Sequence, residues 1–137
     1  MRSLALTAAL TCLWLSPAAG DQAQPPKGPA GGKIIFDQVC APCHGKDARG
    51  TGPVAPSLKT PPADLTRISA RRGGGRFPSD EVATYIDGRK DVAAHGTREM
   101  PVWGDSFAQA VKETDTREAR IQKAIQMLVY YLQTLQQ

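Results

Sequence analysis

The sequence is short of cysteine, histidine and aromatic residues. Its 137 residues include three Cys, two His, three Phe, three Tyr and two Trp. So few cysteines exclude a small scaffold stapled by several disulfides. The length is that of one domain, and a core with so little aromatic volume would gain from a bound cofactor.

Strong charge of either sign is also missing. The net charge is +4, and no basic run interleaved with aromatic residues occurs, so we expect no nucleic-acid binding. A mildly basic surface suits solubility and docking to an acidic partner. After the first twenty residues no segment is apolar enough to cross a bilayer, so the mature chain is expected to lack a membrane span.

Residues 1–20 have the layout of a secretory signal peptide. Arg2 gives a positive start, residues 4–15 form an apolar run, and small residues follow. A membrane-spanning helix needs about 20 apolar residues, and this run is shorter. We therefore predict cleavage after Ala19 or Gly20 and export to the periplasm, with an uncleaved anchor as the alternative.

Cys12 lies inside this apolar run and is expected to be removed with it. A lipid-bearing role for this cysteine is disfavoured, because the apolar stretch before it is short. Residues 21–31 are polar and rich in Pro and Gly, which is typical of a flexible leader. Residues 32–137 are then predicted to form the folded domain.

The spacing of apolar residues predicts an all-α domain of three to five helices. Ser79 is expected to cap one of these helices, ahead of two acidic residues. Loops as long as those between the helices are unusual unless they wrap around something. Helices are predicted at 32–40, 63–71, 79–87 and 121–135, with loops at 45–62 and 89–106.

The segment Cys40-Ala41-Pro42-Cys43-His44 has the strongest chemical signal. A thioredoxin-like disulfide would need a βαβ pattern around it, and none is present. A structural zinc site needs four ligands, and no second cysteine pair exists. Two thiols three residues apart can instead form thioethers with the vinyl groups of a haem, while the following histidine binds its iron. The C-x-x-C-H pattern therefore predicts one covalent haem c.

Met100 is the predicted ligand on the opposite side of the iron. It precedes Pro101, which restricts the backbone, in a loop remote enough from His44 to reach the other haem face. His95 is the rival ligand, with an exposed loop histidine as the simpler interpretation. Met127 lies beside apolar residues of the last predicted helix and is interpreted as a core residue.

These residues resemble the class I cytochromes c, which are small monohaem electron carriers with His and Met ligands. The resemblance covers residue 32 to about 135. It implies that Gly32 lets the first helix cross closely against the last, with Phe36 packed into the crossing. The matching partners in the last helix are Leu128 and Tyr131.

The resemblance also implies roles around the haem. Pro56-Ser57-Leu58 matches a Pro-x-Leu motif, in which the proline carbonyl accepts a hydrogen bond from the histidine Nδ1 and the leucine packs on the haem. Met100-Pro101 matches the loop of the sixth ligand. Trp103 is expected to cover the haem edge or to replace a tryptophan that the family places on the haem propionates.

Two segments have no counterpart in the family pattern, the Gly-rich loop at 71–76 and the insert at 89–97. The partner of the propionates is therefore open. The arginines that could serve are Arg71, Arg72, Arg76 and Arg89, for most of which a solvated surface position is the simpler interpretation.

Three functions follow from these predictions. The first is a periplasmic electron carrier that is not itself an enzyme, with Lys46, Arg49 and Lys59 near the haem edge facing acidic redox partners. The second is a haem subunit bound to a periplasmic dehydrogenase or a terminal oxidase. The third, a gas sensor or peroxidase, would need Met100 to leave the iron.

Overall fold

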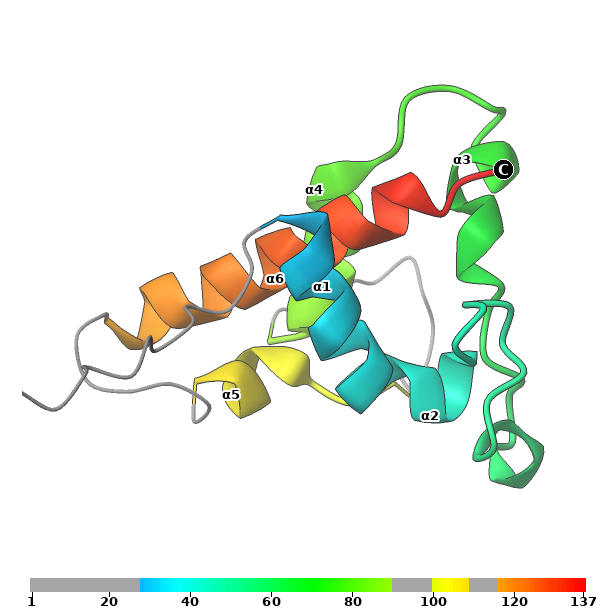
Figure 1. Cartoon of the computed structure of the whole chain (residues 1–137), viewed down its shortest axis with the longest axis horizontal. Helices are drawn as coiled ribbons and strands as arrows, with labels where there is room; N and C mark the ends of the chain where they lie inside the picture. The colour runs from blue at the N-terminus through cyan, green and yellow to red at the C-terminus, as the bar shows by residue number, and fades with distance from the viewer. Residues whose placement is uncertain (1–27, 90–99, 109–115) are drawn as a thin grey trace, which may run out of the picture.

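The described part of the chain is helical. A computed structural model describes residues 28–89, 100–108 and 116–137, and no strand occurs among them (Figure 1). The predicted signal peptide, most of the predicted leader and His95 lie outside these residues. The all-α prediction is confirmed for the described residues.

The elements follow one another in a simple order along the chain. They are α1 (Pro29–Ile35), a π-helical turn (Phe36–Cys40), α2 (Ala41–His44), two 3-10 turns (Ala55–Ser57 and Leu65–Arg67), α3 (Ile68–Arg71), α4 (Ser79–Asp87), α5 (Trp103–Phe107) and α6 (Arg117–Thr134).

The first helix is longer than predicted at both ends. It begins at Pro29, before the expected start at Gly32, because a proline in the first turn costs no hydrogen bond. It also continues past Cys40 without a break, through the π-helical turn into α2. Gly45, with φ of 78°, ends this rod.

The predicted crossing of the first and last helices is present (Figure 1). A Cβ atom on Gly32 would lie 1.9 Å from the carbonyl oxygen of Met127. The rings of Phe36 and Tyr131 pack with their centroids 5.3 Å apart, and Leu128 is buried against them. The absence of a side chain at Gly32 is therefore what allows α1 and α6 to touch.

Helix α6 supplies most of the core. Thr116 caps its N-terminus by accepting a hydrogen bond from the Ala119 amide over 3.3 Å. One face of α6 is buried, and the apolar residues on it recur every three or four positions, as the sequence predicts. The buried residues are Ile121, Ile125, Leu128, Val129, Tyr131 and Leu132.

Several predicted element boundaries were wrong. Helix α4 (Ser79–Asp87) has its predicted bounds, but Pro78 occupies the N-cap position and no side chain caps the helix, so the capping role predicted for Ser79 was wrong. The stretch 63–71 is a 3-10 turn followed by α3, not one helix. Two turns of helix also lie in predicted loops, at Ala55–Ser57 and in α5. These elements are too short to show a helical period in the sequence.

Candidate haem site

The two cysteines and His44 lie at the end of the first helical rod. Cys40 is the last residue of the π-helical turn, while Cys43 and His44 belong to α2. Insertions of this type in helices often mark functional positions. Both thiols are half-buried and not joined in a disulfide. Burial raises the pKa of the Cys40 thiol to about 12, with a smaller effect from Cys43.

The loop after Gly45 folds back onto α2 and fixes its C-terminal end. The Gly50 amide donates to the His44 carbonyl over 2.7 Å. The Gly52 amide donates to the Cys43 carbonyl over 3.1 Å. A Cβ atom on Gly52 would lie only 2.4 Å from the Pro42 carbonyl oxygen. These contacts satisfy carbonyls that a helix end leaves without partners, and they hold the histidine backbone.

The imidazole of His44 is held by a backbone carbonyl. Its Nδ1 lies 3.0 Å from the Ala63 oxygen, and because a carbonyl only accepts, Nδ1 carries the proton. Burial lowers the pKa of His44, and the bond to Ala63 opposes that shift. A neutral ring with a protonated Nδ1 presents a lone pair on Nε2, which is the form that binds iron.

Ala63 takes the role that the resemblance assigned to Pro56, so that prediction is wrong. Pro56 lies in the exposed 3-10 turn Ala55–Ser57, and Leu58 is 36% exposed. The same spacing of acceptor and leucine recurs at Ala63 and Leu65, and Leu65 packs against the core. Contact of Pro56 and Leu58 with a haem stays a prediction.

The backbone around Ala63 is anchored from the CxxCH side. The Leu65 amide donates to the carbonyl of buried Ala48 over 2.7 Å. Asp64 accepts from the hydroxyl of Thr66 over 2.6 Å and from its amide over 2.9 Å. The Thr66 hydroxyl lowers the pKa of Asp64, so this cap persists near neutral pH. The segment directly after Ala63, the acceptor of the histidine bond, is therefore fixed by three hydrogen bonds.

Met100 lies against the same core from another direction. It is half-buried and packs against the buried apolar cluster, as does Trp103 at the start of α5. The Trp103 and Phe107 rings stack with centroids 6.0 Å apart and an interplanar angle of 20°. Met127 is half-buried in α6 with its carbonyl against Gly32. Ligation of iron by Met100 remains a prediction.

An ion-pair cluster holds the helices that flank Met100. Arg89 donates to Asp87 at the end of α4 over 2.8 Å, and to Glu118 at the start of α6 over 2.8 Å. These bonds to Arg89 are the main cause that lowers the pKa of Glu118 to about 2. A Cβ on Gly104 of α5 would lie 2.3 Å from an Asp87 oxygen. The cluster was not predicted, because Glu118 is 29 residues from Arg89 in the sequence.

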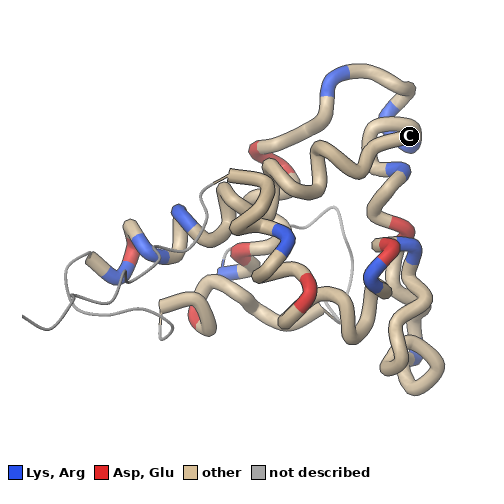
Figure 2. Tube along the Cα trace, viewed as in Figure 1, with Lys and Arg blue, Asp and Glu red and all other residues tan. Residues whose placement is uncertain are grey.

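Three of the four arginines proposed for the propionates take protein partners. Arg71 donates to the Asp64 carbonyl over 2.8 Å, Arg72 pairs with Glu81, and Arg89 belongs to the ion-pair cluster. Figure 2 shows the basic residues spread over several elements. Lys46, Arg49 and Lys59 are exposed.

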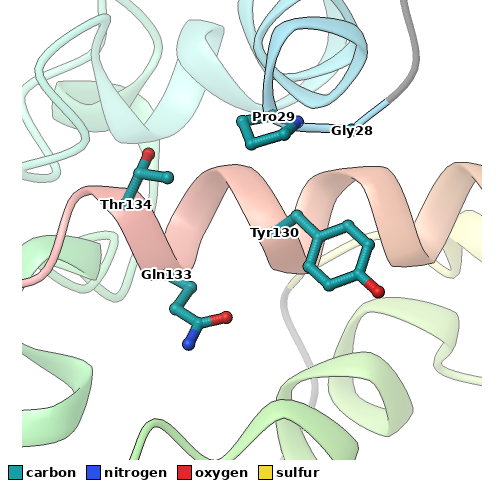
Figure 3. A pocket seen from close by; sticks show the side chains of 5 residues that line it. All are labelled: Gly28, Pro29, Tyr130, Gln133 and Thr134. Carbon is teal, nitrogen blue, oxygen red and sulfur yellow. The ribbon is translucent and has the colours of Figure 1, made fainter.

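A groove elsewhere on the molecule is unrelated to these residues. It has a volume of 530 Å³ and lies where the start of α1 meets the end of α6 (Figure 3). None of the predicted haem-binding residues lines it. The lining residues are Gly28, Pro29, Tyr130, Gln133 and Thr134.

The donor set near α2 fits a covalent haem. Two half-buried thiols and an oriented neutral imidazole lie on consecutive turns of one rod. Other apolar side chains pack on the core but stay partly exposed, and such side chains suit the face of a porphyrin. These include Val39, Leu65, Ile68, Met100 and Trp103. Within the described ranges, no three His, Cys, Asp or Glu side chains gather as a metal-ligand cluster.

Comparison with known protein families now adds an independent observation. The model of the family described as "Cytochrome C oxidase, cbb3-type, subunit III" matches residues 27–115. The chain belongs to this family. It is accordingly a c-type cytochrome, with a covalently bound haem c and a function in electron transfer.

The match with this cytochrome family includes both Cys40–His44 and Met100 and stops before α6. No curated protein and no solved structure matches the chain. Within its described residues, the cytochrome has no helix with the length and apolar character needed to cross a membrane.

Proposed function

We propose that this chain carries electrons in the periplasm through a single haem c, with His44 and Met100 as the axial ligands. Cys40 and Cys43 would hold the haem as thioethers. The observation that carries the proposal is the bond between His44 Nδ1 and the Ala63 carbonyl. It keeps one ring nitrogen protonated and leaves the other for iron.

The protein residues have separate tasks in this proposal. A haem supplies an iron that changes its oxidation state by one electron. The Ala63 carbonyl orients the imidazole and raises its basicity, which favours the ferric state. A thioether ligand from Met100 favours the ferrous state. Apolar side chains around the haem also favour it, because they disfavour the additional positive charge of ferric iron. The potential of the protein is the balance of these effects.

Docking to redox partners would use the exposed surface near α2. Lys46, Arg49 and Lys59 are exposed there, which suits a partner with an acidic face. Contacts between electron-transfer proteins are small and short-lived, so a few surface charges are enough to guide them. Export by residues 1–20 would place the protein among periplasmic partners. Loss of the protein from the periplasmic fraction when these residues are deleted would support this placement.

Absorption spectroscopy tests the ligand set. The chain is produced in an exporting host that attaches haem, and spectra of both oxidation states are recorded with and without carbon monoxide. We expect a low-spin spectrum with the weak methionine-to-iron band and no response to carbon monoxide. Met100→Ala should lose that band, while Met127→Leu, a volume-conserving change in α6, should keep it.

Two results would contradict the ligand assignment. One is a methionine-to-iron band that survives in Met100→Ala. The other is a high-spin spectrum or rapid carbon monoxide binding in the unmodified protein, which would mean an open iron face and favour sensing or catalysis.

A second candidate function is a haem subunit of a terminal oxidase. The family description, which names a subunit of an oxidase, favours it over a dehydrogenase partner. Size-exclusion chromatography of a mild detergent extract from the native cells separates the two functions. A carrier elutes alone at the mass of one chain, whereas a subunit elutes with oxidase activity in a large complex.

A further inference from the structure

The C-terminus of the chain lies against the segment that follows Ala63. Figure 1 shows the end of α6 running to the helical turns around α3. Gln136 makes three hydrogen bonds there with its side chain. Its Oε1 accepts from the Ser69 amide over 2.9 Å, and its Nε2 donates to the carbonyls of Leu65 over 2.9 Å and Leu132 over 2.7 Å. One side chain therefore joins α6 to both ends of this turn.

The last residue adds to the same attachment. The Gln137 backbone amide donates to the Thr66 carbonyl over 3.0 Å. The Arg49 guanidinium donates to the side-chain oxygen of Gln137 over 3.4 Å. Gln136 is half-buried, so water competes only in part for these bonds. The Leu65 backbone is then held at its amide by the Ala48 carbonyl and at its carbonyl by the Gln136 side chain.

We propose that Gln136 is a positioning residue for His44. It clamps residues 65–69 to α6, and because Ala63 lies two residues before Leu65, the clamp keeps the Ala63 carbonyl aligned with His44 Nδ1. The inference rests on the proposed function, in which His44 binds the haem iron. Loosening the clamp would weaken the Nδ1 bond and make the imidazole a weaker donor to iron.

Hydrogen exchange in the reduced holoprotein tests this inference, with three protons as probes. The Ser69 amide reports the clamp, the His44 Nδ1 proton reports the site, and the Ile125 amide in the middle of α6 reports global opening. The variant is Gln136→Leu, which keeps the volume and removes every hydrogen bond of the side chain. Gln133→Leu is the matched control, since Gln133 is exposed near the end of α6, three residues before Gln136, and its side chain bonds to none of the described residues.

We expect Gln136→Leu to speed exchange at Ser69 and at His44 Nδ1 by about tenfold, the value of one hydrogen bond, with Ile125 unchanged. The reduction potential should also rise, because a less basic imidazole stabilises the ferric state less. Gln133→Leu should change none of these values. A purely structural role of Gln136 would leave the potential where it was.

Three outcomes would overturn the inference. Unchanged exchange at Ser69 means that the clamp contributes nothing. Faster exchange at Ser69 with His44 and the potential unchanged means that it does not reach the histidine. Equal acceleration of all three probes means that only global stability fell. Failure of the proposed function is seen separately, as a wild-type spectrum without histidine ligation of the iron.

Discussion

The two predicted axial ligands are held in different ways. Around His44 the contacts rely on backbone groups: the Gly50 and Gly52 amides bond to carbonyls of α2, and the Ala63 carbonyl bonds to the imidazole. Around Met100 the contacts run through side chains, such as the stacked rings of α5 and the ion pairs of Arg89.

This difference has a physical consequence. Backbone hydrogen bonds carry no titrating group and no net charge, so they depend little on pH or salt, and a substitution disturbs them mainly when it introduces a clash. Ion pairs on the surface are screened by salt and end when the carboxylates are protonated. The His44 side should therefore be the rigid side of the site, and the Met100 side the one that responds to solution conditions.

A pair of glycine substitutions gives the largest expected contrast. A Cβ on Gly52 would lie 2.4 Å from the Pro42 oxygen and 2.6 Å from the Ala41 oxygen, both backbone atoms that cannot move aside. A Cβ on Gly104 would meet Asp87 and Arg89 side-chain atoms, which can rotate. Gly52→Ala should lower the free energy of unfolding by about 3 kcal/mol and Gly104→Ala by about 1 kcal/mol or less.

Urea unfolding of the two purified variants measures this contrast. Equal losses would show that the Met100 side is as rigid as the His44 side. Gly75→Ala is the control, since nothing lies within 4 Å of the added Cβ atom. Gly28→Ala would not serve, because its φ of 73° is strained for any residue with a side chain. Gly75→Ala should leave the free energy of unfolding within about 0.5 kcal/mol of the wild type.

Two leucines test which segment supports the histidine. Leu65 packs half-buried against the core beside Ala63, while Leu58 is 36% exposed. Leu65→Ala should lower the free energy of unfolding by about 1–2 kcal/mol, part of the value for a fully buried leucine, and should shift the haem absorption. Leu58→Ala should change stability by less than about 0.5 kcal/mol. Thermal unfolding and absorption spectra of both variants decide, and a larger effect at Leu58 would restore the role predicted for Pro56-Ser57-Leu58.

The smallest expected effect is the response of the ion-pair cluster to acid. Hydrogen bonds with Arg89 lower the pKa of Glu118 from 4.5 to about 2. A carboxylate with a depressed pKa contributes its stability fully above pH 4.5 and loses it as the pH falls toward 2. Glu118→Gln should therefore lower the melting temperature slightly at pH 7 and flatten its decline between pH 4.5 and 2.

Asp105→Asn is the matched control for this effect. Asp105 pairs with Arg117 over 2.8 Å, and both side chains are largely exposed. That pair should contribute less than the Arg89 cluster, whose arginine is only 24% exposed. If the melting temperature of Glu118→Gln falls between pH 4.5 and 2 as steeply as that of the wild type, the Arg89–Glu118 pair makes no measurable contribution to stability. High salt should reduce the difference between wild type and Glu118→Gln.

Several features could be read from local patterns. The CxxCH segment is contiguous, so its spacing alone predicts the chemistry of the site. The α1–α6 crossing at Gly32 and Phe36 was implied by the resemblance to the class I cytochromes c, and both residues lie on one face of the first helix. The long buried stripe of α6 is periodic enough to be recognised without a structure.

Other features depend on residues that meet only after folding. Ala63 replaces Pro56 as the histidine partner because of how the loop closes on Gly50, whose added Cβ would lie 2.2 Å from the Pro62 oxygen. Helix α5 has five residues, fewer than two helical periods, so its stability comes from packing and not from a sequence pattern.

The amino-acid sequence by itself therefore determined the covalent haem attachment at Cys40–His44 and the all-α fold class, since both depend on residues that are near neighbours in the chain. The partner of His44, the Arg89 cluster and the Gln136 attachment join residues from distant parts of the chain. No local pattern encodes such pairs, because loop closure and the packing of α6 determine which groups come within hydrogen-bonding distance.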